Sequence, residues 1–459
     1  MTAAIRKELR PMIRLAAPLA MAELGWMVMG IVDTIMAGRL GAAAIGAGSL
    51  GSMLFWPIVI SGAGMLYGMD TEVSQSFGAR DETACRRSLI QGLWLALSVS
   101  PVAAAALAAM LPLLRAVHTN PRVMELLAPF VKALIWGVLP LLSYTALRRY
   151  LQAINIVKPI TFAVVSANVV NFAGNWLLMY GNWGVPRLGL TGSGISTSIS
   201  RVYIAAVLLA ALLWHERKHG YPLFRMSWLP DADHIRRLAA IGFPVAIQVL
   251  AEGAVFGIVS VMAAKLDEAS LAAHGIAVNV IATTFMVPLG ISSAAAVRVG
   301  HAVGRRDTHG AAVSGWTALL LSAIFMGAAG LALFFIPDAI ARLYTPDASL
   351  IPLTAVLLRI AAFFELFDGF QVVAGGALRG LGDTASPAIA HFVGYWLAGM
   401  PLGWALCFPW HWGVRGIWVG LTVALILVGG ALVWVWARAL VGQASWPAQI
   451  ADKPGGLPH

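Results

Sequence analysis

Long runs of hydrophobic residues, separated by short polar segments, make up most of the chain. Each run has the roughly 20 residues that a helix needs to cross a hydrocarbon layer about 30 Å thick. The runs lie near 11–37, 48–70, 88–114, 126–148, 159–180, 191–214, 237–263, 274–297, 311–336, 350–378, 385–408 and 414–437. This pattern predicts an all-α integral membrane protein with about twelve transmembrane helices, six in each half.

The first part of the chain recurs in the second part at a constant offset, 244 − 18 = 226 positions, without a gap. The matched pairs include Pro18 with Pro244, Ala20 with Ala246, Leu24 with Leu250, Gly64 with Gly290, Gly78 with Gly304 and Arg80-Asp81 with Arg306-Asp307. Six spans return the chain to its starting side, so the two halves share one orientation and the repeat is parallel. Two six-helix lobes around a central site are typical of a transporter.

A hydrophilic stretch after the sixth span divides the chain. We expect an N-lobe over residues 1–214, a cytoplasmic linker over 215–236, and a C-lobe over 237–459 that ends in a short cytoplasmic tail. Gly220, Pro222 and Pro230 should prevent the linker from forming one continuous helix.

Composition supports the membrane assignment, because 59% of the 459 residues are hydrophobic and only 11% are charged. That leaves too little polar surface for a water-soluble protein of this size. The two cysteines, Cys85 and Cys407, indicate neither a disulfide framework nor a metal site.

The net charge of +10 comes largely from basic residues that the predicted topology places on one side of the membrane. They include Arg6, Lys7, Arg10, Arg14, Arg80, Arg86, Arg87, Arg148, Arg149, Lys158, Arg298, Arg305 and Arg306. Since positively charged loops stay in the cytoplasm, both termini and the linker are expected inside a multi-pass protein of the cell's inner membrane. The same rule explains the basicity without a nucleic acid partner.

Ionisable residues inside spans are the main functional candidates, since each costs about 2.5–3.5 kcal/mol to insert at a helix centre. They are Glu23, Asp33, Glu252, Glu365 and Asp368. The repeat aligns Asp33 with Val259 and Glu252 with Trp26, so the scaffold is duplicated while the charges are not. The alternative role for each acid is a structural hydrogen bond or ion pair inside the protein.

Span five carries Asn168, Asn171 and Asn175 at spacings i, i+3 and i+7, which put them on one helical face. Beside a carboxylate, their carbonyl oxygens would suit a hard cation or a proton relay. Contacts that hold neighbouring helices together are an equally good explanation.

Two motif matches are not expected to be catalytic. His215–His219 fits HExxH, but it begins a loop before Gly220 and Pro222 and has no evident third zinc ligand. Gly380–Asp383 fits GxGD of intramembrane proteases, but Leu151–Asn155 matches it in the first half, which favours a helix-ending turn. We therefore expect neither an enzyme nor a metal site.

Several segments together resemble the multidrug and toxic compound extrusion (MATE) family, in its NorM-like branch. They are Val32–Gly38, Gln75–Ala79, Gly242–Pro244 with Glu252, Arg298–Gly300, and Asp368–Val373 followed by Ala377–Gly380. The resemblance covers essentially the whole chain, and the family fold is twelve helices in two six-helix lobes.

The resemblance implies a secondary active antiporter that exports cationic amphipathic drugs in exchange for inward Na⁺ or H⁺ by alternating access, and we expect the protein to be a monomer. It assigns an N-lobe cation site to Asp33, Asn171 and Asn175, and a C-lobe site to Glu252 and Asp368. Asn168 and Glu365 are possible additional members. Glu23 stands where the family pattern has glutamine, so it could add a second titrating group. No cofactor beyond the coupling ion is implied, and the choice between Na⁺ and H⁺ stays open.

Two other functions would fit part of this pattern. A lipid-linked precursor flippase of a related superfamily would share the architecture, but its phosphates would need a strongly basic cavity, and the recognised intramembrane charges are acidic. A membrane-embedded hydrolase would need a convergent nucleophile or metal set, for which HExxH lies in the wrong place.

Overall fold

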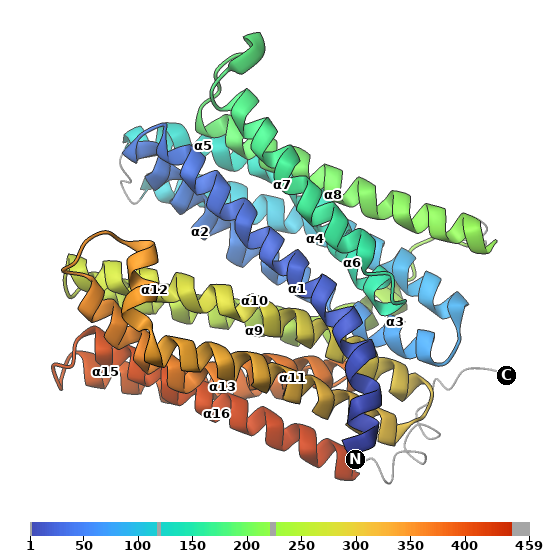
Figure 1. Ribbon diagram of the computed structural model, residues 1–459. Coiled ribbons are helices and arrows are strands. Elements are labelled where there is room, and N and C mark those ends of the chain that lie inside the picture. The colour runs from blue at the N-terminus through green and yellow to red at the C-terminus, as the bar shows by residue number, and fades with distance from the viewer. Residues whose placement is uncertain (1, 117–120, 221–225, 443–459) are drawn as a thin grey trace. The chain divides into compact units, whose positions relative to one another are not determined.

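The computed structural model describes residues 2–116, 121–220 and 226–442, which are almost entirely helical (Figure 1) and contain no strand. The helices are α1 (Thr2–Gly38), α2 (Ala42–Met65), α3 (Gly68–Gly78), α4 (Glu82–Ala116), α5 (Pro121–Ile135), α6 (Val138–Ala153), α7 (Lys158–Leu178), η1 (Asn182–Gly184), α8 (Leu190–His219), α9 (Ala232–Ala264), α10 (Glu268–Gly304), α11 (Thr308–Phe335), α12 (Pro337–Tyr344), α13 (Ile351–Leu381), α14 (Ala385–His391), the π-helix η3 (Phe392–Gly399), α15 (Met400–Cys407) and α16 (Val414–Gly442). Residues 221–225 of the predicted linker over 215–236, and the C-terminal residues 443–459, lie outside the described residues.

Helices lie at all twelve spans predicted from the sequence. In the described part of the chain, nine helices are long and apolar enough to cross a membrane. The count is ten if α5 and α6, which bend by 42° at their junction, form one span. The two other predicted spans are also helical, as α13 and as the run of α14, η3 and α15. The all-α membrane fold is thus confirmed.

The helices pack into two compact units. The N-lobe unit comprises Met21–Val73 and Glu82–Leu250, and the C-lobe unit comprises residues up to Ala20, Ser74–Asp81 and residues from Ala251 onward. The first parts of α1 and α9 therefore belong to the unit of the other repeat. The predicted lobe boundaries at 214 and 237 follow the sequence repeats, not these packing units. The division into lobes at those residues stays a prediction.

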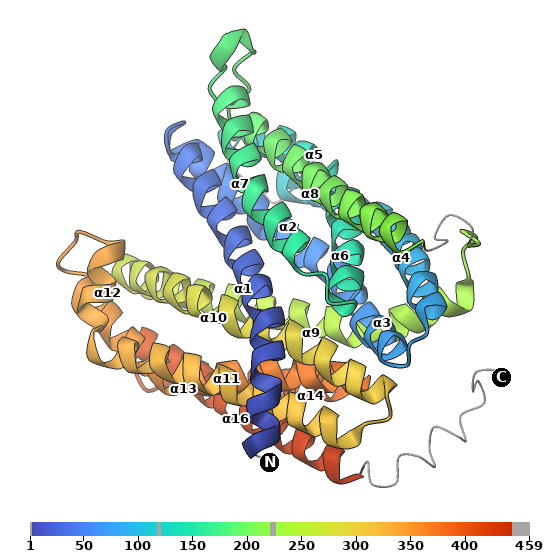
Figure 2. The ribbon, with the colours of Figure 1, turned by 45° about the vertical axis from the view of Figure 1, so that its right-hand side comes forward.

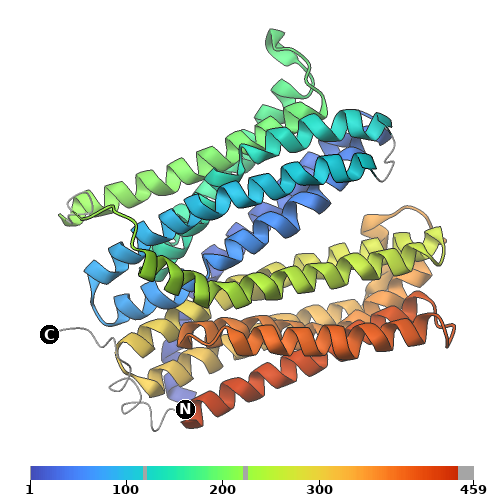
Figure 3. The same ribbon diagram turned by 180° about the vertical axis from the view of Figure 1, so that it is seen from behind.

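Each unit has its own helix packing. In the N-lobe unit α7 packs against α8 (Figure 2), and in the C-lobe unit α13 contacts α10, α11 and α16. Seen from behind, α15 lies along α16 (Figure 3). Pro18 and Pro244 lie inside α1 and α9, where proline removes a backbone hydrogen bond and favours bending.

Small residues allow two equivalent helix contacts in the two repeats. A Cβ on Gly64 would lie 2.7 Å from Cα of Ala246, within the N-lobe unit. A Cβ on Gly290 would lie 2.6 Å from Cα of Ala20, within the C-lobe unit. Gly64 and Ala20 align with Gly290 and Ala246, so one backbone contact is made twice with the roles exchanged.

Candidate functional site

Asp33 of α1 lies among polar side chains from α7 and α8, inside the N-lobe unit. The Nδ2 atom of Asn175 donates to Oδ1 of Asp33 at 2.5 Å, and Oγ1 of Thr197 donates to Oδ2 at 3.3 Å. Asn175 also donates to Oδ1 of Asn171 at 3.2 Å, and both asparagines are fully buried. The structure thus brings Asp33, Asn171 and Asn175 together and adds Thr197, while their role in ion binding stays a prediction.

Asn168 does not join this group. Its Nδ2 atom donates to the backbone oxygens of Gly25, at 3.0 Å, and Val164, at 2.9 Å. The side chain therefore links α7 to α1, which matches the helix-packing alternative for this position.

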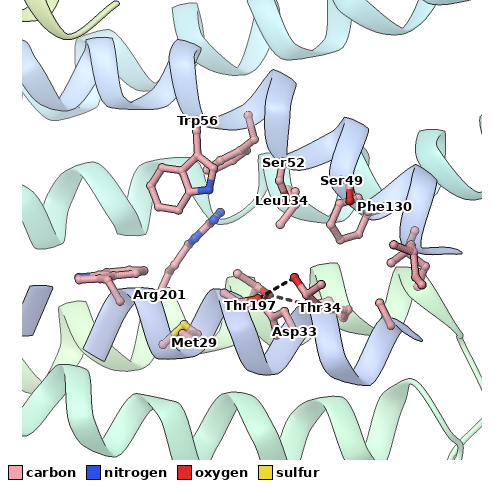
Figure 4. A pocket seen from close by; sticks show the side chains of 18 residues that line it. Met29, Asp33, Thr34, Ser49, Ser52, Trp56, Phe130, Leu134, Thr197 and Arg201 are labelled. Carbon is pink, nitrogen blue, oxygen red and sulfur yellow. Dashed lines mark hydrogen bonds between the residues drawn. The ribbon is translucent and has the colours of Figure 1, made fainter. Parts of the chain in front are cut away.

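A cavity of about 230 Å³ opens beside Asp33 (Figure 4). Its lining combines aromatic rings, hydroxyl groups, one carboxylate and one guanidinium. These residues include Trp26, Phe55, Trp56, Phe130, Thr34, Ser49, Ser52, Ser193, Thr197, Asp33 and Arg201. Such a lining suits an aromatic, amphipathic ligand that carries charge.

The C-lobe unit gathers the other predicted carboxylates around α13. Asp368 accepts a hydrogen bond from Nε2 of Gln371 at 2.9 Å, and Gln371 is also a hydrogen-bonding neighbour of Glu252 on α9. Glu365 accepts from Oγ1 of Thr284 at 3.2 Å, while its Oε2 is buried without a partner. Glu252 and Asp368 are thus linked through Gln371, which the sequence analysis did not identify as a site residue.

Tyr395 is a second residue that the sequence analysis missed. It lies on the π-helix η3, is 1% exposed, and its buried hydroxyl has no hydrogen-bond partner. π-Helical turns are frequent at functional sites, but this geometry leaves no clear signal in a single sequence.

Glu23, the possible additional acid, forms an ion pair with Arg148 of α6. Both side chains are largely buried, at 13% and 7% exposure. Arg148 and Arg149 were expected beside a cytoplasmic loop, but both are buried in α6, and Arg149 pairs with Asp70 at 3.1 Å. The buried charges of the spans are therefore not all acidic. For Glu23, the ion pair fits the alternative role as a structural contact inside the protein.

The HExxH match is positioned differently from the expectation. His215–His219 forms the last turn of α8, which ends at Gly220 with a φ of +69°, rather than beginning a loop. Glu216 is held by Nε of Arg86 at 3.1 Å. Across the described ranges, no cluster of three or more His, Cys, Asp or Glu side chains could hold a metal ion.

The chain matches the MatE family model twice, over residues 18–177 and 244–405. The chain belongs to the MATE family. The two matches begin at Pro18 and Pro244, the positions that define the offset of 226 residues read from the sequence. Family membership and the internal repeat are therefore confirmed by the same observation.

Similar proteins place this MATE transporter in the NorM group. It is 34% identical to the probable multidrug resistance protein NorM of Mesorhizobium japonicum, covering 94% of each chain. It is 36% identical to the multidrug resistance protein NorM of Burkholderia vietnamiensis, covering 92% of each. Among solved structures, the eukaryotic MATE transporter AtDTX14 matches with a TM-score of 0.87 at 17% identity, over 96% of this chain and 98% of that one. This last likeness supports the fold.

Proposed function

We propose that the protein is a multidrug efflux antiporter that exports cationic, amphipathic drugs in exchange for inward Na⁺ or H⁺. The observation that carries the proposal is the carboxylate of Asp33, held by neutral donors at the wall of an aromatic-lined cavity. Similarity to multidrug resistance proteins named NorM over 94% of the chain supports it.

In this account Asp33 binds either the coupling ion or the cationic drug, so occupancy by one weakens affinity for the other. The ion and the drug must differ in their effects on the two conformations, because a ligand that binds both conformations with equal affinity does not shift the equilibrium between them. Glu252 and Asp368 form the corresponding C-lobe site. The protein works as a monomer in the cell's inner membrane, with both termini cytoplasmic and no cofactor beyond the coupling ion.

The membrane potential can supply the driving force. One elementary charge moving inward gains about 2.3 kcal/mol per 100 mV. This sustains a gradient of about fifty-fold for a neutral substrate, at tenfold per 1.4 kcal/mol. One-for-one exchange with a monovalent cationic drug is electroneutral, so that case requires the chemical gradient of the ion or the entry of two ions.

Transport in proteoliposomes under separately imposed Na⁺ and H⁺ gradients tests the proposal. Uptake or release of a fluorescent cationic drug should follow one of the two gradients, and Asp33→Asn should abolish it while the protein stays folded and inserted. Phospholipid flipping should be absent from the same vesicles. Drug movement that ignores both gradients, or near-normal transport by Asp33→Asn, would contradict the proposal.

A further inference from the structure

The first turns of α1, dark blue in Figure 1, carry a stripe of basic and apolar side chains along one face. Arg6, Arg10 and Arg14 follow one another at i, i+4 and i+8, so a helix with about 3.6 residues per turn aligns them. Leu9 and Ile13 lie between them on the same face. All three arginines are exposed, and Ile13 is 42% exposed. These five residues form the basic stripe.

The opposite face of the same turns is fixed to the C-lobe unit. Glu8 accepts hydrogen bonds from Nε and Nη2 of Arg298 on α10, at 2.7 and 2.6 Å, and from Oγ of Ser314 on α11, at 2.9 Å. Met12 and Leu15, on the same side of the helix as Glu8, are buried. The two-point ion pair and the buried side chains set the rotation of α1, which leaves the basic stripe exposed.

The charges of the basic stripe are not neutralised by the protein. In the parts of the chain that the structure describes, none of its three arginines forms an ion pair, and Glu8, the acid of this segment, already pairs with Arg298. A hollow of about 330 Å³ is lined by the five residues of the stripe. Cations beside apolar side chains in one exposed hollow suit a ligand with an anionic head and an apolar chain.

The basic stripe lies at the expected membrane surface. The first predicted span begins near residue 11, so the stripe crosses the cytoplasmic end of that span in the proposed orientation. The eight residues from Arg6 to Arg14 cover about 12 Å along the helix axis. Arginine side chains near a helix end extend to the interface, and basic segments beside a span attract the anionic lipids of the cytoplasmic leaflet.

We propose that the basic stripe binds anionic glycerophospholipids of the cytoplasmic leaflet. The phosphate groups lie on Arg6, Arg10 and Arg14, and the acyl chains lie beside Leu9 and Ile13. A guanidinium suits this role because its paired N–H donors match the oxygens of a phosphate. The inference goes beyond the proposed function, since it concerns the lipid around the protein and takes from that proposal only the orientation in the membrane.

Short-range quenching by brominated lipids tests the inference. Ala17 is exposed on the face of the stripe, and a cysteine at this position, in a background without Cys85 and Cys407, carries a bimane label. The purified full-length protein is reconstituted in phosphatidylcholine that contains increasing fractions of brominated phosphatidylglycerol or brominated phosphatidylcholine. Since each arginine near the surface contributes about fivefold, half-maximal quenching should need at least about tenfold less phosphatidylglycerol.

Two sets of substitutions separate the basic stripe from general electrostatic attraction. Arg6→Gln, Arg10→Gln and Arg14→Gln together should lower the preference for phosphatidylglycerol by about tenfold, whereas lysine at the same three positions should keep most of it. The matched control removes the same charge from exposed turns that are also expected in the cytoplasm. It combines Arg80→Gln, Arg305→Gln and Arg306→Gln, and it should keep the preference.

Three results would overturn the inference. They are equal quenching by the two lipids in the wild-type sequence, an unchanged preference in the stripe variant, and equal losses in the stripe and control variants. The first comparison needs no arginine substitution, so it decides the matter even if the stripe variant does not fold. No drug or ion gradient enters the measurement, so a failure of the proposed transport would not alter its outcome.

Discussion

The buried carboxylates differ in the partners that hold them. Asp33 accepts hydrogen bonds from the neutral groups of Asn175 and Thr197, so its charge remains available to a cation. Glu23 faces Arg148, which already neutralises it. The sequence identified both acids, because a charge in an apolar run stands out. It could not identify the partner of Glu23, which is 125 positions away in the chain.

Arg201 shows the other limit at this scale. The sequence shows it as a charge inside the apolar span 191–214, but the predicted site contains only acids and asparagines. Its guanidinium, whose Nε and Nη1 atoms have no partner, lies beside Gly137, between α5 and α6, and beside the ring of Phe55 on α2. Only the fold brings these residues together.

Removing the charge of Glu23 should destabilise the protein. Glu23→Gln leaves Arg148 buried without a counter-charge, which costs about 3 kcal/mol. Thermal unfolding in detergent should show a lower midpoint, and Glu23→Leu combined with Arg148→Met should recover much of the loss. A Glu23→Gln protein of normal stability with an altered ion stoichiometry would instead make Glu23 a coupling residue.

Glu252 and Asp368 should behave as one site. Glu252→Gln and Asp368→Asn are each expected to slow efflux, and the double variant should lose less than the sum of the two effects, because either change already removes most of the site. Initial rates, normalised to protein in the membrane, give the double-mutant cycle. Strict additivity, or a normal rate in either single variant, would argue against a shared C-lobe site.

At the scale of elements, the apolar runs predicted the spans well, since each run must satisfy its backbone hydrogen bonds within a helix. The helix-ending turns at Gly380–Asp383 and Leu151–Asn155 were also predictable, because the repeat places the two segments at matching positions. In the structure Gly382 and Asn155 follow their helices with positive φ values of +94° and +64°. The bend at Gly137 and the π-helix η3 could not be predicted from the sequence, because both depend on how neighbouring helices pack.

Two glycines of α10 provide a matched test of helix packing. Gly290→Ala places a Cβ 2.5 Å from the backbone nitrogen of Ala20 and should destabilise the C-lobe unit by about 1–3 kcal/mol through overpacking. Gly275→Ala, with nothing within 4 Å, should be neutral or stabilising by about 0.5–1 kcal/mol. Thermal unfolding of the two variants compares them directly, and equal midpoints would exclude the close contact.

At the scale of the whole molecule, the repeat was readable from the sequence because its offset needs no gap, and the family model matches at the same two starting points. The exchange of the first parts of α1 and α9 between the units was not readable. Each helix continues without a break through the point at which its packing partners change, and its apolar residues lie on both sides of that point.

Orientation in the membrane can be measured with single cysteines. In a background that lacks Cys85 and Cys407, cysteines placed at Arg187 and Lys265 should react with an impermeant reagent added outside intact cells. Cysteines at Arg80 and Arg306 should react only after the cells are opened, because the basic loops are expected in the cytoplasm. All four positions lie in exposed segments. The reverse labelling pattern would invert the topology.

The most direct test of ion-coupled export is drug-driven movement of the ion itself. Proteoliposomes with no ion gradient receive a gradient of a cationic drug, and the internal Na⁺ and pH are followed with indicator dyes. Antiport predicts that the drug drives one of these ions in the opposite direction, and that Asp33→Asn abolishes this countertransport. Drug movement without any counterflow of Na⁺ or H⁺ in the wild-type protein, or unchanged counterflow in Asp33→Asn, would contradict the account.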